Sequence, residues 1–149
     1  MVERAERLGF DVRFARWRLA ALPENPTGFV VSRLLETSPE GADLIIAKSL
    51  GCRAAAHAAR MQTPAVWMTP VLTDPEVAAG IADNPAPQLV VAGSRDPMHD
   101  STAAAGLGCA VLELSGLDHA LSATGDFVVP DAILEQIAGA TDDFLRRLP

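Results

Sequence analysis

The chain has 149 residues, of which 49% are hydrophobic and 21% are charged, a composition typical of one globular domain with a sizeable core, here over residues 1–149. Its formal net charge of -7, with no basic patch, argues against nucleic acid as a partner. No apolar run is long enough to cross a bilayer and residues 1–20 carry too many charges for a signal peptide, so we expect a cytoplasmic protein with no membrane partner.

The first third of the chain is predicted to contain two helices and one strand. Residues 2–8 have a helical pattern, and residues 10–17 alternate apolar and charged side chains as a strand does. After a proline-rich loop, Thr27 is expected to cap a helix that ends at residues 38–41.

The rest of the chain alternates short apolar strands with helices. Residues 44–47 form an apolar run expected to be a strand buried on both faces, as in a parallel sheet covered by helices. Further strands are predicted at residues 65–68, 89–92 and 110–112, and helices at 51–59, after Asp74, around Ala103 and from Ile133 to Leu148. This alternation predicts an α/β fold: a mostly parallel sheet of about five strands with helices on both faces, in three layers.

Three short segments with chemically useful side chains follow predicted strands. Residues 47–51 (Ala-Lys-Ser-Leu-Gly) lie between an apolar strand and a helix, the setting of a sharp turn that holds a serine clear of the sheet. Asp96 and His119 follow two later strands, so all three groups should meet at the edge formed by the strands' carboxyl ends. A serine becomes a good nucleophile only beside a base, and that base needs an orienting carboxylate.

These segments resemble the α/β-hydrolase family, and the resemblance runs over most of the chain. Residues 47–51 match the family's Gly-x-Ser-x-Gly elbow, with alanine at the first glycine position. The resemblance implies Ser49 as nucleophile, Asp96 as triad acid, His119 as base and the backbone N–H of Leu50 as one oxyanion-hole donor. It implies a carboxylesterase-like serine hydrolase that cleaves an ester, thioester or related acyl bond of a small acyl substrate, with no metal and no organic cofactor.

Each candidate also has a purely structural interpretation. The alternative for Ser49 is an ordinary turn residue that caps the following helix. Asp96 would serve as a helix cap, with Asp100 as the rival acid. The rival bases are His57 and His99.

Four residues near the elbow are candidates for the substrate site. Lys48 is either a steering group for anionic acyl substrates or a rim side chain. The other three either wall an acyl pocket or pack in the core. They are Trp67, Met68 and Leu72.

The family pattern is incomplete at the start of the chain. Residues 2–8 match the helix after the family's third strand and residues 10–17 match its fourth strand, so the first three strands have no counterpart. The family's third strand lies between its fourth and fifth, and its absence would leave backbone groups unpaired. Either residues 10–17 pair directly with residues 44–47, or another chain fills the slot and makes a homo-oligomer, or the natural chain begins before Met1. The loop that supplies the second oxyanion donor is also missing, so the esterase activity is expected to be weak.

Two other functions compete with a hydrolase. A non-catalytic hydrolase-like domain that binds a small ligand or a protein partner would account for the missing strands, but it has no use for all three triad residue types. A flavodoxin-like nucleotide or flavin binder shares the sheet class, but no glycine-rich phosphate loop follows the first strand.

Overall fold

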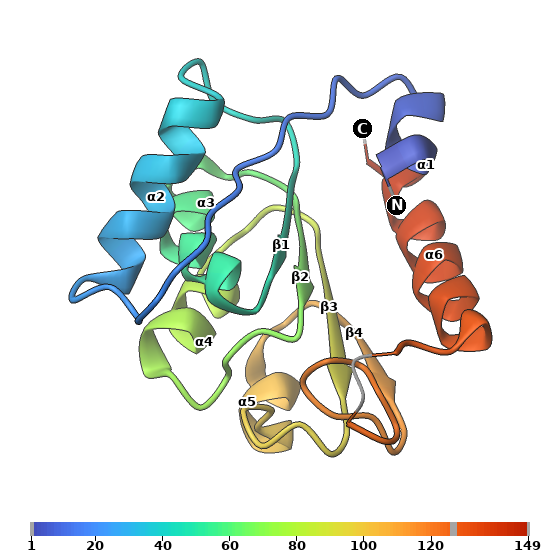
Figure 1. Cartoon of the computed structure of the whole chain (residues 1–149). Helices are drawn as coiled ribbons and strands as arrows, with labels where there is room; N and C mark the ends of the chain where they lie inside the picture. The colour runs from blue at the N-terminus through green and yellow to red at the C-terminus, as the bar shows by residue number, and fades with distance from the viewer. Residues whose placement is uncertain (1, 126–127, 149) are drawn as a thin grey trace.

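The computed structural model describes residues 2–125 and 128–148, which are built around a parallel sheet. The strands are β1 (Ile45–Lys48), β2 (Ala65–Met68), β3 (Gln88–Gly93) and β4 (Ala110–Leu114). Their order in the sheet is β1-β2-β3-β4, so each crossover connects neighbouring strands (Figure 1). The α/β class and the parallel sheet are confirmed, but in the described part of the chain the sheet has four strands rather than about five.

Helices cover both faces of this sheet, as expected (Figure 1). One face is covered by α2 (Pro26–Thr37), the 3-10 helix η1 (Ser49–Ala54), α3 (Ala55–Met61), α4 (Pro75–Ala82) and α5 (Ser101–Gly106). The other face is covered by α6 (Asp131–Leu145), and the short α1 (Val2–Arg7) lies on the same side. None of the described helices is long and apolar enough to span a membrane.

The two central strands, β2 and β3, are buried along their whole length. Trp67 and Val90 enter the core cluster beneath α2, α3, α4 and α5. The alternate residues Val66 and Val91 point to the opposite face, where they belong to the same cluster as Ile137 of α6. Burial on both faces explains why these strands read as unbroken apolar runs.

The start of α2 differs from the expectation that Thr27 caps it. The N-cap is Asn25, whose side-chain oxygen accepts a hydrogen bond from the backbone N–H of Gly28 at 2.8 Å. Proline is favoured at the first helical position, so Pro26 places the cap on the residue before it. Thr27 donates its hydroxyl proton to Glu76 instead.

The strand expected at residues 10–17 is also wrong, because residues 10–19 form no regular element. Side chains hold this segment in place: Arg13 donates to Glu40 at 2.6 Å, and the rings of Trp17 and Phe29 meet edge to face with centroids 5.7 Å apart. An alternating pattern is not enough for a strand, because a β-ladder also needs a neighbouring strand to pair with. The segment does not pair with β1, so the first of the three arrangements considered for the missing strands does not occur here.

β1 is therefore an edge strand, not a strand buried on both faces as expected. The backbone N–H of Ile45 bonds to Pro64 on the β2 side, so the backbone groups of the next residue, Ile46, face away from the sheet. The side chain of Ile46 is 38% exposed.

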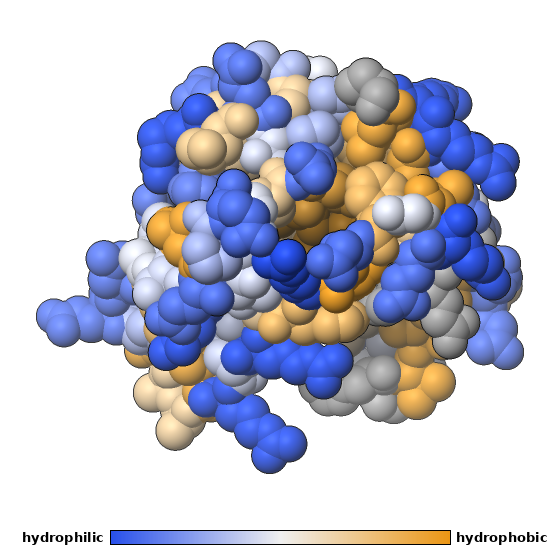
Figure 2. Space-filling model, turned by 90° about the horizontal axis from the view of Figure 1, so that it is seen from above, coloured by the Kyte–Doolittle hydropathy of each residue, from blue (hydrophilic) through white to orange (hydrophobic). Residues whose placement is uncertain are grey.

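Seen from above, the molecule has a hollow with apolar surface at its centre (Figure 2).

We predict that the chain self-associates through the edge of β1, since open strand edges with apolar side chains recruit other chains. Replacing Ile46 with lysine should lower the mass in solution, measured by size exclusion with light scattering over a concentration series. Val111→Lys makes the same change on the other edge strand, β4, where Val111 is 39% exposed, so association through β1 predicts a loss of mass in Ile46→Lys alone. A wild-type chain that stays monomeric at every concentration would contradict the prediction.

Candidate active site

Ser49 lies at the sharp turn between β1 and η1. Its φ of 50° falls in the left-handed region, which non-glycine residues rarely adopt and which costs roughly 1–3 kcal/mol. The residues around this turn are small and lie close together: a Cβ placed on Gly51 would be in ordinary contact, at 3.4 Å, with the Cβ of Ala47. The structure thus has the strand, tight turn and helix expected around Ser49, and Ala47 fits where the motif has glycine.

A chain of two short hydrogen bonds joins the three residues implied by the resemblance. The hydroxyl oxygen Oγ of Ser49 lies 2.7 Å from Nε2 of His119, and Nδ1 of His119 lies 2.8 Å from Oδ2 of Asp96. An ionised carboxylate can only accept, so Nδ1 carries the proton and Nε2 is left to accept the proton of Ser49. The structure therefore brings together the serine, the histidine and the acid.

Asp96 occupies the turn after β3, and its side chain is fully buried. Its second oxygen, Oδ1, accepts a hydrogen bond from the backbone N–H of Met98 at 2.8 Å. The cap of α5 is Asp100, whose carboxylate accepts from Thr102 and Ala103. Of the two aspartates weighed as the acid, Asp100 is thus occupied as a helix cap and Asp96 contacts the histidine.

The loop that carries His119 is fastened to the end of β3. The backbone N–H of Arg95 donates to the carbonyl of Leu117 at 2.8 Å, and the hydroxyl of Ser94 accepts from the backbone N–H of Gly116 at 2.8 Å. Asp118 closes its own loop, since its carboxylate accepts from the N–H groups of Ala120 and Ser122. These bonds place the histidine and the acid on one rigid assembly of loops.

The two other histidines have different surroundings. His57 lies on α3, where burial and then the nearby Arg60 lower its pKa. His99 pairs with Glu113, with Nε2 2.8 Å from the carboxylate, and its side chain is only 2% exposed.

Lys48 extends from the end of β1 toward the histidine loop. Its ammonium lies 3.2 Å from the carbonyl oxygen of His119 and 3.3 Å from the hydroxyl of Thr69. Its role in steering anionic substrates stays a prediction. Thr69 was not singled out by the sequence, in which its position directly after a strand is the only signal.

Trp67, Met68 and Leu72 are all core residues. Trp67 is fully buried and donates its indole N–H to Gln88 at 2.8 Å. Met68 and Leu72 are 9% and 3% exposed and belong to the clusters on opposite faces of the sheet. Packing, the alternative that the sequence left open, is the role seen here, and an acyl-pocket role stays a prediction.

Leu50 follows Ser49 in the first turn of η1. The first backbone N–H groups of a helix have no partner within it and carry its partial positive charge, so this position suits an oxyanion donor. The donor role of Leu50 stays a prediction.

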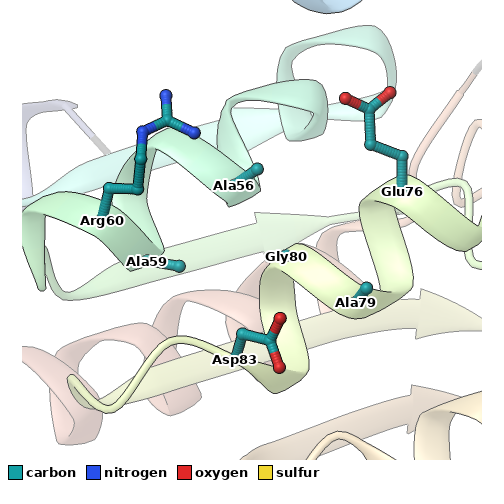
Figure 3. Close-up of a pocket in the computed structure, with 7 residues that line it drawn as sticks. All are labelled: Ala56, Ala59, Arg60, Glu76, Ala79, Gly80 and Asp83. Atoms are coloured by element: carbon teal, nitrogen blue, oxygen red, sulfur yellow. The ribbon is translucent and has the colours of Figure 1, made fainter.

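A surface hollow between α3 and α4 is separate from these residues (Figure 3). It is lined by Ala56, Ala59, Arg60, Glu76, Ala79, Gly80 and Asp83. α3 and α4 pack closely here, since a Cβ on Gly80 would lie 2.5 Å from the backbone nitrogen of Ala56. The hollow above this contact is open because most of the side chains along it are small. Across residues 2–125 and 128–148, no group of three or more His, Cys, Asp or Glu side chains could hold a metal ion.

Replacing Gly93 with alanine should destabilise the fold by about 1–3 kcal/mol. The added Cβ would lie 2.3 Å from the carbonyl oxygen of Leu117, a backbone atom that cannot turn aside. Urea unfolding measures the change, with Gly106→Ala as control because nothing lies within 4 Å of a Cβ there. Equal unfolding free energies in the two variants would show that the histidine loop is not packed against β3 as described.

A comparison with protein-family models found no match, and neither did a comparison with curated proteins. Solved structures of similar fold include two that each have 16% identity and a TM-score of 0.59. One is a predicted CIB-like hydrolase from Thermoplasma acidophilum, and the match covers 83% of this chain and 59% of that one. The other is an α/β serine hydrolase homologue from Coxiella burnetii, with 92% and 66% covered. The chain spans less than two thirds of either structure, and it has the fold of the α/β-hydrolases in a shortened form.

Proposed function

We propose that this protein is a serine hydrolase that cleaves an ester, thioester or related acyl bond of a small substrate. The observation that carries the proposal is the continuous chain of hydrogen bonds from Ser49 through His119 to the buried carboxylate of Asp96, at 2.7 and 2.8 Å. The two similar structures described above are a predicted hydrolase and a serine hydrolase homologue, which supports the reaction class. A non-catalytic binding domain has no need of a serine aligned on a histidine in this way.

In the proposed reaction, Nε2 of His119 takes the proton of the Ser49 hydroxyl while Oγ attacks the acyl carbon. The tetrahedral intermediate carries its negative charge on the former carbonyl oxygen, where the backbone N–H of Leu50 donates a hydrogen bond. His119 then returns the proton to the leaving group, and an acyl-enzyme forms on Ser49. Water attacks this ester with His119 again as base, which releases the acid and restores the serine.

Asp96 supports both proton transfers without being protonated itself. Its buried carboxylate accepts from Nδ1 of His119, which holds the imidazole in the tautomer that leaves Nε2 free to accept. When His119 carries two protons, the negative charge of Asp96 stabilises the imidazolium. The hydrogen bond from Met98 keeps the carboxylate itself in one orientation.

Ser49 should react covalently with a fluorophosphonate probe, because its hydroxyl is hydrogen-bonded to a base at a half-buried turn. Fluoride leaves as Oγ forms a phosphonate ester, and intact mass spectrometry reads the gain in mass. Ser49→Ala is the control. Equal labelling of the two proteins would place the reactive group elsewhere, and no labelling of the wild type would favour the binding domain.

Hydrolysis of an activated ester should rise with pH, since only the neutral imidazole of His119 can accept the serine proton. His119→Ala should remove this rise and slow turnover roughly 10²–10⁴-fold. His57→Ala is the matched control and should keep the full profile, because His57 lies on α3 and not beside Ser49. If the rise survives in His119→Ala, another group is the base.

A further inference from the structure

Beyond the proposed reaction, and resting on it, we propose that Lys48 is a positioning residue that holds the backbone of His119 at the right distance from Ser49. Lys48 directly precedes Ser49 in the chain, and its ammonium lies 3.2 Å from the carbonyl oxygen of His119. The same two residues also meet through their side chains, at 2.7 Å. Nucleophile and base are thus attached to each other at two points.

These two attachments close a ring. The ring runs from Ser49 through the peptide bond to Lys48, along its side chain to the carbonyl of His119, and back through the imidazole to the hydroxyl of Ser49. A single hydrogen bond lets the two partners move apart together with their loops, whereas a closed ring limits how far their backbones can separate. The bonds from Ser94 and Arg95 fasten the histidine loop to the end of β3, and Lys48 fastens it to the end of β1.

Thr69 directs the ammonium toward its target. Its hydroxyl accepts from Lys48 at 3.3 Å, and the residue is fully buried with its backbone N–H bonded to Val91 at 2.7 Å. Thr69 also has a φ of 44°, so its backbone is fixed in an uncommon conformation directly after β2. The side chain of Lys48 therefore crosses the end of β2 while hydrogen-bonded to a buried residue with a fixed backbone.

The surroundings of Lys48 affect its charge in opposite directions. Partial burial lowers the pKa of its ammonium, and the carboxylates of Asp96 and Asp118 act in the opposite direction. A carbonyl and a hydroxyl oxygen, both acceptors, face the ammonium. Lys48 is also the only lysine in a sequence with eleven arginines, so this position has a compact ammonium on a long flexible stem where every other cation is a guanidinium.

The test compares Lys48→Met, which keeps the stem and loses the donor, with Lys48→Arg, which restores a cationic donor. Arg60→Met is the matched control for loss of one positive charge, at an exposed site on α3. Fluorophosphonate labelling should slow roughly 10- to 100-fold in Lys48→Met, as small misplacements of reacting groups do, and recover at least in part in Lys48→Arg. Arg60→Met should label like the wild type.

A second measurement separates positioning from activity. The ring nitrogen signals of His119 in ¹⁵N NMR should change in Lys48→Met and stay unchanged in Arg60→Met, while the melting temperatures of the two variants remain similar. If Lys48→Met does not fold, Thr69→Val, which removes the hydroxyl that directs the ammonium, should shift the same signals. Unchanged His119 signals together with an unchanged labelling rate in Lys48→Met would overturn the proposal. Absence of labelling in the wild type would refute the hydrolase function alone, because the NMR signals report the position of His119 without any reaction.

Discussion

The close contact between the end of β3 and the histidine loop determines where the candidate base lies. At Gly93 the backbone of β3 runs so near Leu117 that even a Cβ would stand 2.3 Å from its carbonyl oxygen. This approach lets the next two residues, Ser94 and Arg95, bond to the loop and bring His119 over the carboxyl ends of the strands. Asp96 follows in the same turn, so the close approach at Gly93 brings the acid and the histidine loop together.

The burial of Asp96 determines the orientation of the His119 imidazole. A carboxylate with a fully buried side chain must be paired, because an unpaired buried charge costs several kcal/mol. Here the two partners are the backbone N–H of Met98 and Nδ1 of His119, one on each oxygen. The acid is therefore fixed from the protein side, and the imidazole has one orientation that satisfies it. In that orientation Nε2 meets Ser49.

The sequence predicted a segment correctly where its own residues determine its structure, and failed where that structure depends on a distant neighbour. The apolar runs at residues 65–68 and 89–92 need burial on both faces, which only central strands provide, and they form β2 and β3. The serine, acid and histidine follow β1, β3 and β4, and this was enough to expect them at one edge, because parallel strands end together. Residues 10–17 were misjudged because their alternation does not say whether a neighbouring strand is available. The contact of Thr69 with Lys48 joins residues 21 positions apart, and no local pattern indicates it.

Because the serine directly follows an edge strand, the hydrogen bond from Lys48 to the backbone of His119 is important for its position. β1 pairs with β2 alone among the described strands, and Ser49 leaves it in a strained left-handed conformation. An edge strand held by one ladder is freer to shift than β2 or β3, each of which is held on two sides. The side chain of Lys48 spans the end of β2 and reaches the backbone of His119, so it connects this edge to the loop fastened to β3. Among the described strands β1 has no second neighbour, so its serine is held through the side chain of Lys48 where a second ladder would otherwise hold it.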